Sequence, residues 1–105
     1  MHLDRHQNSL LFPRLWPCTG GGRVIPAETV GSIARAAGVP FLLDACQSVG
    51  MMQVDVQALQ CDVLTATGRK FLRGPRGSGL LFVRDDFVDK LDPCMLDQKG
   101  ALLLR

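Results

Sequence analysis

The sequence predicts an α/β fold in which helices alternate with strands, and three segments indicate it. Residues 27–37 carry apolar side chains at helical spacing and precede Gly38, which predicts an amphipathic helix that ends there. Residues 39–43 form a wholly apolar run, which predicts a strand buried on both faces. Residues 62–66 predict a second strand after a short helix near residues 54–59. Two strands joined by such a crossover are normally parallel.

The segment after the second strand predicts a return of the chain and a third strand. Residues 71–79 are dense in glycine and arginine, which favours turns. Residues 79–84 are rich in β-forming side chains and predict a short strand. A last helix is expected over residues 87–91, with Asp85 and Asp86 as its cap.

Length and composition limit the size and the class of the protein. The chain has 105 residues, so it holds one domain at most, with a smaller core than an ordinary α/β enzyme domain. Residues 1–18 show no sustained period and are expected to be a poorly ordered lead-in to a domain over residues 19–105. The net charge of +2 and the charged fraction of 21% predict neither a nucleic-acid nor a membrane partner. With no apolar membrane span and no signal peptide in the pattern, a cytoplasmic protein is expected.

The cysteines and histidines predict no metal site. The four cysteines are widely spaced: Cys18, Cys46, Cys61 and Cys94. That spacing favours free thiols over a zinc knuckle or a redox dithiol. Cys46, one residue from Gln47, could contact a site there, but a small buried side chain is the first expectation. His2 and His6 could share a helix face, but nothing near them in the sequence completes a metal site.

Polar side chains with complementary chemistry follow the first two predicted strands. Asp44 and Gln47 follow the first strand, and Thr67, Arg69 and Lys70 follow the second. Ligands of open α/β sheets bind outside the carboxyl ends of the strands, so both groups should face one ligand. A carboxylate, an amide, a hydroxyl, a guanidinium and an amine together suit pyridoxal 5'-phosphate (PLP), whose aldehyde forms a Schiff base with a lysine amine.

Each of the five side chains has a role in that interpretation. Lys70 would form the Schiff base, and Asp44 would keep the pyridine nitrogen protonated so that the ring is an electron sink. Gln47 would donate a hydrogen bond to the phenolic oxygen of the ring, and Thr67 and Arg69 would bind the phosphate. Taken alone, Asp44 would more often be a turn or cap residue and Lys70 a solvated loop lysine. The interpretation therefore depends on their combination.

Two longer motifs, Phe41–Gly50 (FLLDACQSVG) and Ala66–Gly77 (ATGRKFLRGPRG), stand in a similar register to the cofactor core of a known family. They resemble the class V aminotransferases, which include the cysteine desulfurases and isopenicillin epimerase-like proteins. Lys70 follows Asp44 by 26 positions, which is similar to the family's spacing. Arg69 stands where many members carry a histidine, so this contact departs from the family pattern.

The resemblance implies a fold and a set of contacts. Residues 19–105 would be part of the large domain of the PLP-dependent transferase fold (fold type I), with a mostly parallel sheet and one antiparallel strand. PLP would be the cofactor, Lys70 the catalytic Schiff-base lysine, and the cofactor contacts would be Asp44, Gln47, Thr67, Arg69 and Lys70. An amino acid would be the substrate, and the family's members are typically homodimers.

Two functions of different classes remain open at this point. The first is a PLP-dependent enzyme acting on an amino acid by transamination, desulfuration, epimerisation or elimination, or a truncated remnant of one that is inactive by itself. The alternative is a non-catalytic fragment or association module without cofactor chemistry, because three short strands leave unpaired edges. A basic loop for nucleic-acid phosphates would explain Arg69, Lys70, Arg73 and Arg76, but Phe71 is the only aromatic residue among them.

Overall fold

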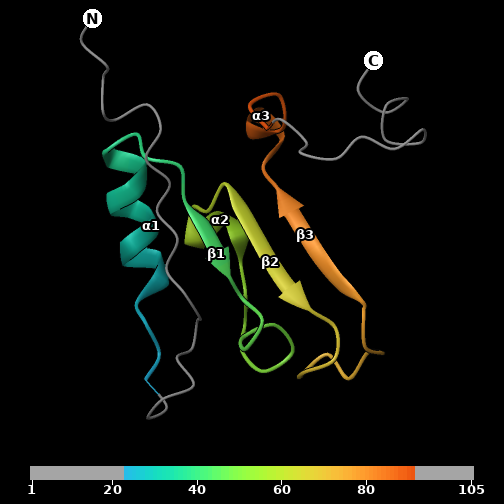
Figure 1. Cartoon of the computed structure of the whole chain (residues 1–105). Helices are drawn as coiled ribbons and strands as arrows, with labels where there is room; N and C mark the ends of the chain where they lie inside the picture. The colour runs from blue at the N-terminus through green and yellow to red at the C-terminus, as the bar shows by residue number, and fades with distance from the viewer. Residues whose placement is uncertain (1–22, 92–105) are drawn as a thin grey trace, which may run out of the picture.

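A computed structural model of the chain describes residues 23–91 and shows three strands with three helices (Figure 1). In chain order the elements are α1 (Ala27–Ala36), β1 (Leu42–Asp44), α2 (Val56–Leu59), β2 (Val63–Thr67), β3 (Gly79–Val83) and α3 (Asp85–Val88). The lead-in predicted for residues 1–18, the pair of histidines within it and two of the cysteines, Cys18 and Cys94, lie outside the described residues.

The strands form one sheet in the order β1-β2-β3. β1 and β2 are parallel, with Leu43 opposite Leu64, and β2 and β3 are antiparallel, with Thr65 opposite Leu81. In Figure 1 the arrows of β1 and β2 point toward the same edge, and β3 returns from that edge. The mixed α/β sheet predicted from the sequence, with its reversed third strand, is therefore confirmed.

The first helix begins after Pro26 and ends where the sequence indicates. Gly38 has a φ of +66°, and its N–H donates to the carbonyl oxygen of Arg35. A residue in this left-handed conformation is the usual way for a helix to end, and glycine adopts it without a steric penalty. The helix buries Ala27, Gly31 and Ala34, which are small enough for α1 to approach its neighbours closely.

The second helix is a single turn fixed by its cap. The Asp55 carboxylate accepts hydrogen bonds from the N–H groups of Gln57 and Ala58 at 2.8 Å and 3.3 Å. Since the first N–H groups of a helix have no partner within it, this cap stabilises a segment too short to be stable by propensity. The turn brings Leu59, which is 1% exposed, into the core.

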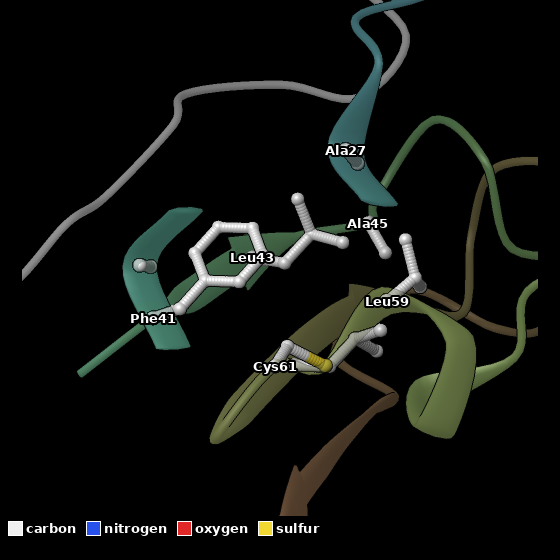
Figure 2. Packing of buried hydrophobic residues seen from close by; sticks show 8 residues of the cluster. Ala27, Phe41, Leu43, Ala45, Leu59 and Cys61 are labelled. Carbon is white, nitrogen blue, oxygen red and sulfur yellow. The ribbon is translucent and has the colours of Figure 1, made fainter. Parts of the chain in front are cut away.

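The core lies between one face of the sheet and the two helices α1 and α2. Phe41, Leu43 and Ala45 alternate along β1 and its flanks, and all three are buried. Figure 2 shows the Phe41 ring and the Leu43 side chain between the ribbon of α1 and the segment that carries Leu59 and Cys61. This small cluster fixes where β1 ends, and therefore where the residues after it are placed.

The burial of β1 and the start of α3 differ from the sequence-based expectation. Leu42 and Asp44 are half-buried, because the buried cluster of the described residues lies on the other face of β1. Asp85 and Asp86 lie within the first turn of α3 and do not cap it; the N-cap residue is Arg84. The Arg84 guanidinium pairs with both Asp62 and Asp86, so this arginine joins the start of α3 to the sheet.

Candidate functional site

The carboxyl ends of β1 and β2 lie at the same edge of the sheet and bring the predicted site residues into two adjacent loops. Asp44 is the last residue of β1, and Gln47 lies in the turn that follows. Thr67 is the last residue of β2, and Arg69 and Lys70 lie in the turn after it. Both loops lie at the lower end of the sheet in Figure 1. The parallel pairing of the two strands is the reason for this proximity.

The loop after β1 is fixed by hydrogen bonds of its own. The Asp44 Oδ1 atom accepts a hydrogen bond from the Cys46 N–H at 2.9 Å, so Asp44 also acts as a turn residue. The Ala45 N–H donates to the Thr65 carbonyl at 2.8 Å and continues the pairing with β2. Ser48 is fully buried, and its hydroxyl donates to the Ala45 carbonyl at 3.2 Å. Gln47, which is half-buried, lies in the sequence between Ala45 and Ser48, both of which are held by these hydrogen bonds.

The loop that carries Lys70 is closed by backbone hydrogen bonds. The Gly68 N–H donates to the Ser78 carbonyl at 2.8 Å, and the Gly74 N–H donates to the Gly68 carbonyl at 2.7 Å. Within this ring the Arg73 N–H donates to the Lys70 carbonyl at 2.9 Å. A Cβ atom on Gly68 would lie 2.2 Å from the Ser78 Oγ atom, so a side chain at position 68 would displace the Ser78 hydroxyl from its hydrogen bond to the Pro75 carbonyl. The loop thus has a defined shape, with Lys70 half-buried in it.

Cys46 lies in the loop after β1 and faces the same cavity as residues of the lysine loop. Burial raises the pKa of its thiol, and the hydrogen bond to Asp44 and the charge of that carboxylate raise it further. The main chain of Thr67 and the positive charge of Lys70 act on the same pKa in the opposite direction. The thiol is therefore close enough for its pKa to be changed by the Asp44 carboxylate in its own loop and by Lys70 in the other loop. Cys46 is only partly buried, whereas a buried side chain was the first expectation from the sequence.

An open cavity of about 400 Å³ lies beside this thiol. Cys46 and Ala66 form one part of its wall. The remaining wall residues come from the end of β2, the lysine loop and the start of β3: Thr67, Arg69, Gly77, Ser78 and Gly79. Thr67 and Arg69 were predicted as site residues, and Ser78 was missed. Its position between two glycines in the loop is the only signal that the sequence offered.

The donors around this cavity fit a group that carries a phosphate. Thr67 and Ser78 contribute hydroxyls and Arg69 a guanidinium, which can bind phosphate oxygens as a bidentate donor. Gly77 and Gly79 leave that part of the wall free of side chains. Asp44, Gln47 and Lys70 are not among the residues that line this cavity, although the Asp44 carboxylate and the Lys70 charge both act on the pKa of the Cys46 thiol in its wall. The cavity wall thus suits a phosphate, and the ring of PLP would need its partners from these neighbouring residues.

Comparison with known proteins shows the same segment in a large group of relatives. A family model described as "Aminotransferase class-V" matches residues 18–99. A protein named "Probable cysteine desulfurase" from Pyrococcus abyssi (strain GE5 / Orsay) is 37% identical over 75 residues, which cover 71% of this chain and 19% of that protein. A cysteine desulfurase of Serratia proteamaculans (strain 568) is 40% identical over 72 residues, which cover 69% of this chain and 18% of the relative.

A solved structure agrees with these similarities. The apo structure of a cysteine desulfurase from Thermococcus onnurineus NA1 aligns with a TM-score of 0.69 and 37% identity over 71% of this chain and 19% of that chain. The chain thus spans about a fifth of the length of the curated relatives it matches. Within residues 23–91, none of the helices is long and apolar enough to span a bilayer.

Proposed function

Because the chain belongs to the class-V aminotransferase family, whose members depend on PLP, we propose that it carries the lysine-bearing part of a PLP enzyme that acts on an amino acid. The observation that supports this most is the parallel register of β1 and β2, with Asp44 opposite Thr65. It brings Asp44 to the edge at which Thr67, Arg69 and Lys70 follow β2.

Each side chain has a separate task in this proposal. Lys70 provides the amine that attaches to the cofactor aldehyde, and Thr67 and Arg69 bind the phosphate. Asp44 retains a proton on the pyridine nitrogen, and its hydrogen bond from the Cys46 N–H restricts the orientation of the carboxylate. Gln47 donates to the phenolic oxygen. When bound, PLP supplies an electron sink for the electron pair released at the α-carbon of the substrate.

The substrate in this proposal is an amino acid, and desulfuration of cysteine is the first reaction to test. Both curated relatives described above are named as cysteine desulfurases. Transamination, epimerisation and elimination proceed from the same attachment of the substrate to PLP, so the residues of this edge serve all four reactions equally. We expect no turnover from the 105-residue chain by itself, because none of the five site residues is assigned to the substrate carboxylate and positioning contributes much of the rate.

Covalent capture of PLP tests the proposal without requiring turnover. The purified chain is incubated with PLP, reduced with borohydride and digested, and the labelled lysine is identified by peptide mass mapping. Attachment joins the lysine nitrogen to the aldehyde carbon with loss of water, and hydride reduction leaves a stable secondary amine. We expect the label at Lys70 in excess over the other two lysines, Lys90 and Lys99. The Lys90 ammonium lies 5.8 Å from the centre of the Phe87 ring, at the opposite edge of the sheet.

Two controls make this result specific. Lys70→Ala should remove the preferred label and leave the Lys90 label unchanged. Asp86→Asn, a change of an exposed carboxylate far from the cavity, should alter neither. A folded chain that labels its lysines evenly would contradict the proposal and would favour the non-catalytic association module instead.

A further inference from the structure

The two loops of the site meet backbone to backbone at Gly50. A Cβ atom on Gly50 would lie 2.7 Å from the carbonyl carbon of Phe71 and 2.9 Å from the nitrogen of Leu72. Real side chains essentially never approach main-chain atoms this closely, so only glycine allows the contact. Gly50 also has a φ of +88°, which side chains rarely adopt. The peptide group that Gly50 contacts begins one residue after Lys70.

Both sides of this contact are anchored. On one side, the N–H groups of Met51 and Met52 donate to the Ser48 carbonyl at 2.9 Å and 2.8 Å, and Ser48 is fully buried. On the other side, the bond from the Arg73 N–H to the Lys70 carbonyl spans the contacted peptide group. Each loop is thus held by hydrogen bonds of its own, and a side chain at Gly50 would press on the main chain next to Lys70.

We propose that Gly50 is a positioning residue, which sets the separation between the lysine loop and the loop that carries Asp44 and Gln47. The inference rests on the proposed function. Gly50 touches no cofactor group in it and acts only by allowing the close approach of the two main chains. A side chain at position 50 separates the loops, so that Lys70 loses its place relative to Asp44 and Gln47, the predicted partners of the cofactor ring. Displacements of about 1 Å reduce the rate of such positioned reactions by up to about 100-fold.

The test compares Lys70 labelling by PLP and borohydride in the full chain and in Gly50→Ala, with Lys90 in the same sample as the internal reference. We expect the ratio of Lys70 to Lys90 label to fall about tenfold. Gly38→Ala is the matched control, because Gly38 also has a positive φ but a Cβ atom there would meet no other atom within 4 Å at the far end of α1. Phe71→Ala should also keep the ratio, because Phe71 contributes its main chain to the contact.

Two further measurements separate positioning from a general loss of structure. Circular dichroism should show that Gly50→Ala keeps the secondary structure. Gly50 is exposed and is not part of the buried hydrophobic cluster. Gly50→Asn is a second variant whose Cβ atom would meet the same Phe71–Leu72 peptide group. It carries less backbone strain, since asparagine tolerates positive φ better than alanine does. It should show the same fall in labelling ratio.

Every outcome bears on the inference. If Lys70 is labelled preferentially in the unchanged chain and both Gly50 variants give the same ratio of Lys70 to Lys90 label as that chain, the inference is overturned and the proposed function stays intact. Even labelling in the unchanged chain would refute the proposed function, and the inference with it. Unfolding of both Gly50 variants would also overturn it, because Gly50 would then support the whole fold and not the position of one loop.

Discussion

The Asp62 carboxylate accepts a hydrogen bond of 2.7 Å from the main-chain N–H of Phe41 and so joins the residue before β1 to the residue before β2. Its other oxygen lies 2.8 Å from the Arg84 guanidinium, at the end of β3. Asp62 is 7% exposed. One buried carboxylate therefore connects all three strands, at the edge of the sheet opposite the candidate site.

Replacing Asp62 should destabilise the fold much more than replacing Asp86, although both carboxylates pair with Arg84. Asp62→Ala leaves the buried Phe41 N–H and one side of the guanidinium without a partner, which costs about 2–4 kcal/mol. Asp86 has a side chain that is 69% exposed, so Asp86→Ala should cost less than about 1 kcal/mol. Urea denaturation followed by circular dichroism measures both, and equal losses would contradict this account of the sheet.

Gly31→Ala should also destabilise the chain, although alanine is the better helix former by about 1 kcal/mol. A Cβ atom at position 31 would lie 1.9 Å from the Leu59 carbonyl oxygen, so α1 and α2 would have to separate. We expect a net loss of about 1–3 kcal/mol in unfolding free energy. Ser32→Ala, at an exposed position of the same helix, should change it by less than about 0.5 kcal/mol. A stabilised Gly31→Ala variant would show that the helices are not in this contact.

The sequence was sufficient to predict the strands, because short apolar runs bounded by glycine and aspartate are strong signals. The crossover predicted the parallel pair, and the reversed third strand was implied by the family resemblance. The sequence was less accurate for where each strand begins. The first strand was expected from residue 39, but pairing with β2 begins at Leu42. Pro40 has no N–H to donate, and the N–H of Phe41 donates to Asp62. A contact 21 residues away in sequence thus decides where the strand starts.

For the candidate site, too, local sequence predicted some features, and others depend on contacts between distant residues. The position of Asp44 and Lys70 at one edge of the sheet could be predicted, because Asp44 ends β1 and Lys70 comes shortly after β2. Ser78 and Gly50 could not, because their roles depend on how two loops approach each other in space. Nothing in the residues around Gly50 indicates that the Phe71–Leu72 peptide group lies against it. The residue types of the site are local information, whereas its geometry is tertiary.

The Cys46 thiol should react slowly with iodoacetamide at neutral pH. Its pKa is raised by burial and by Asp44, so the reactive thiolate forms only above the usual pH range. Asp44→Asn removes the charge that disfavours the thiolate, and the midpoint of the rate against pH should shift downward. Peptide mass mapping separates Cys46 from the other cysteines. A midpoint that Asp44→Asn leaves in place would show that the carboxylate does not act on this thiol.

Cys61 should make the stability of the chain depend on pH in the alkaline range. Burial raises the pKa of its thiol from 9.0 to about 11, and Cys61 is 1% exposed. The folded chain therefore holds this proton more tightly than the unfolded chain does. The resulting stabilisation is fully present below pH 9 and is lost as the pH rises through 11, at up to about 1.4 kcal/mol for each pH unit.

Urea midpoints between pH 8 and pH 11 measure this effect, with Cys61→Ala as the comparison. The variant loses some packing at every pH, but the decline from pH 9 upward should be shallower than in the unchanged chain. The other ionisable groups are the same in both proteins, so their contribution cancels in the difference. If the urea midpoints of the two proteins fall in parallel as the pH rises, the Cys61 thiol titrates at its ordinary pKa and is not buried in the core.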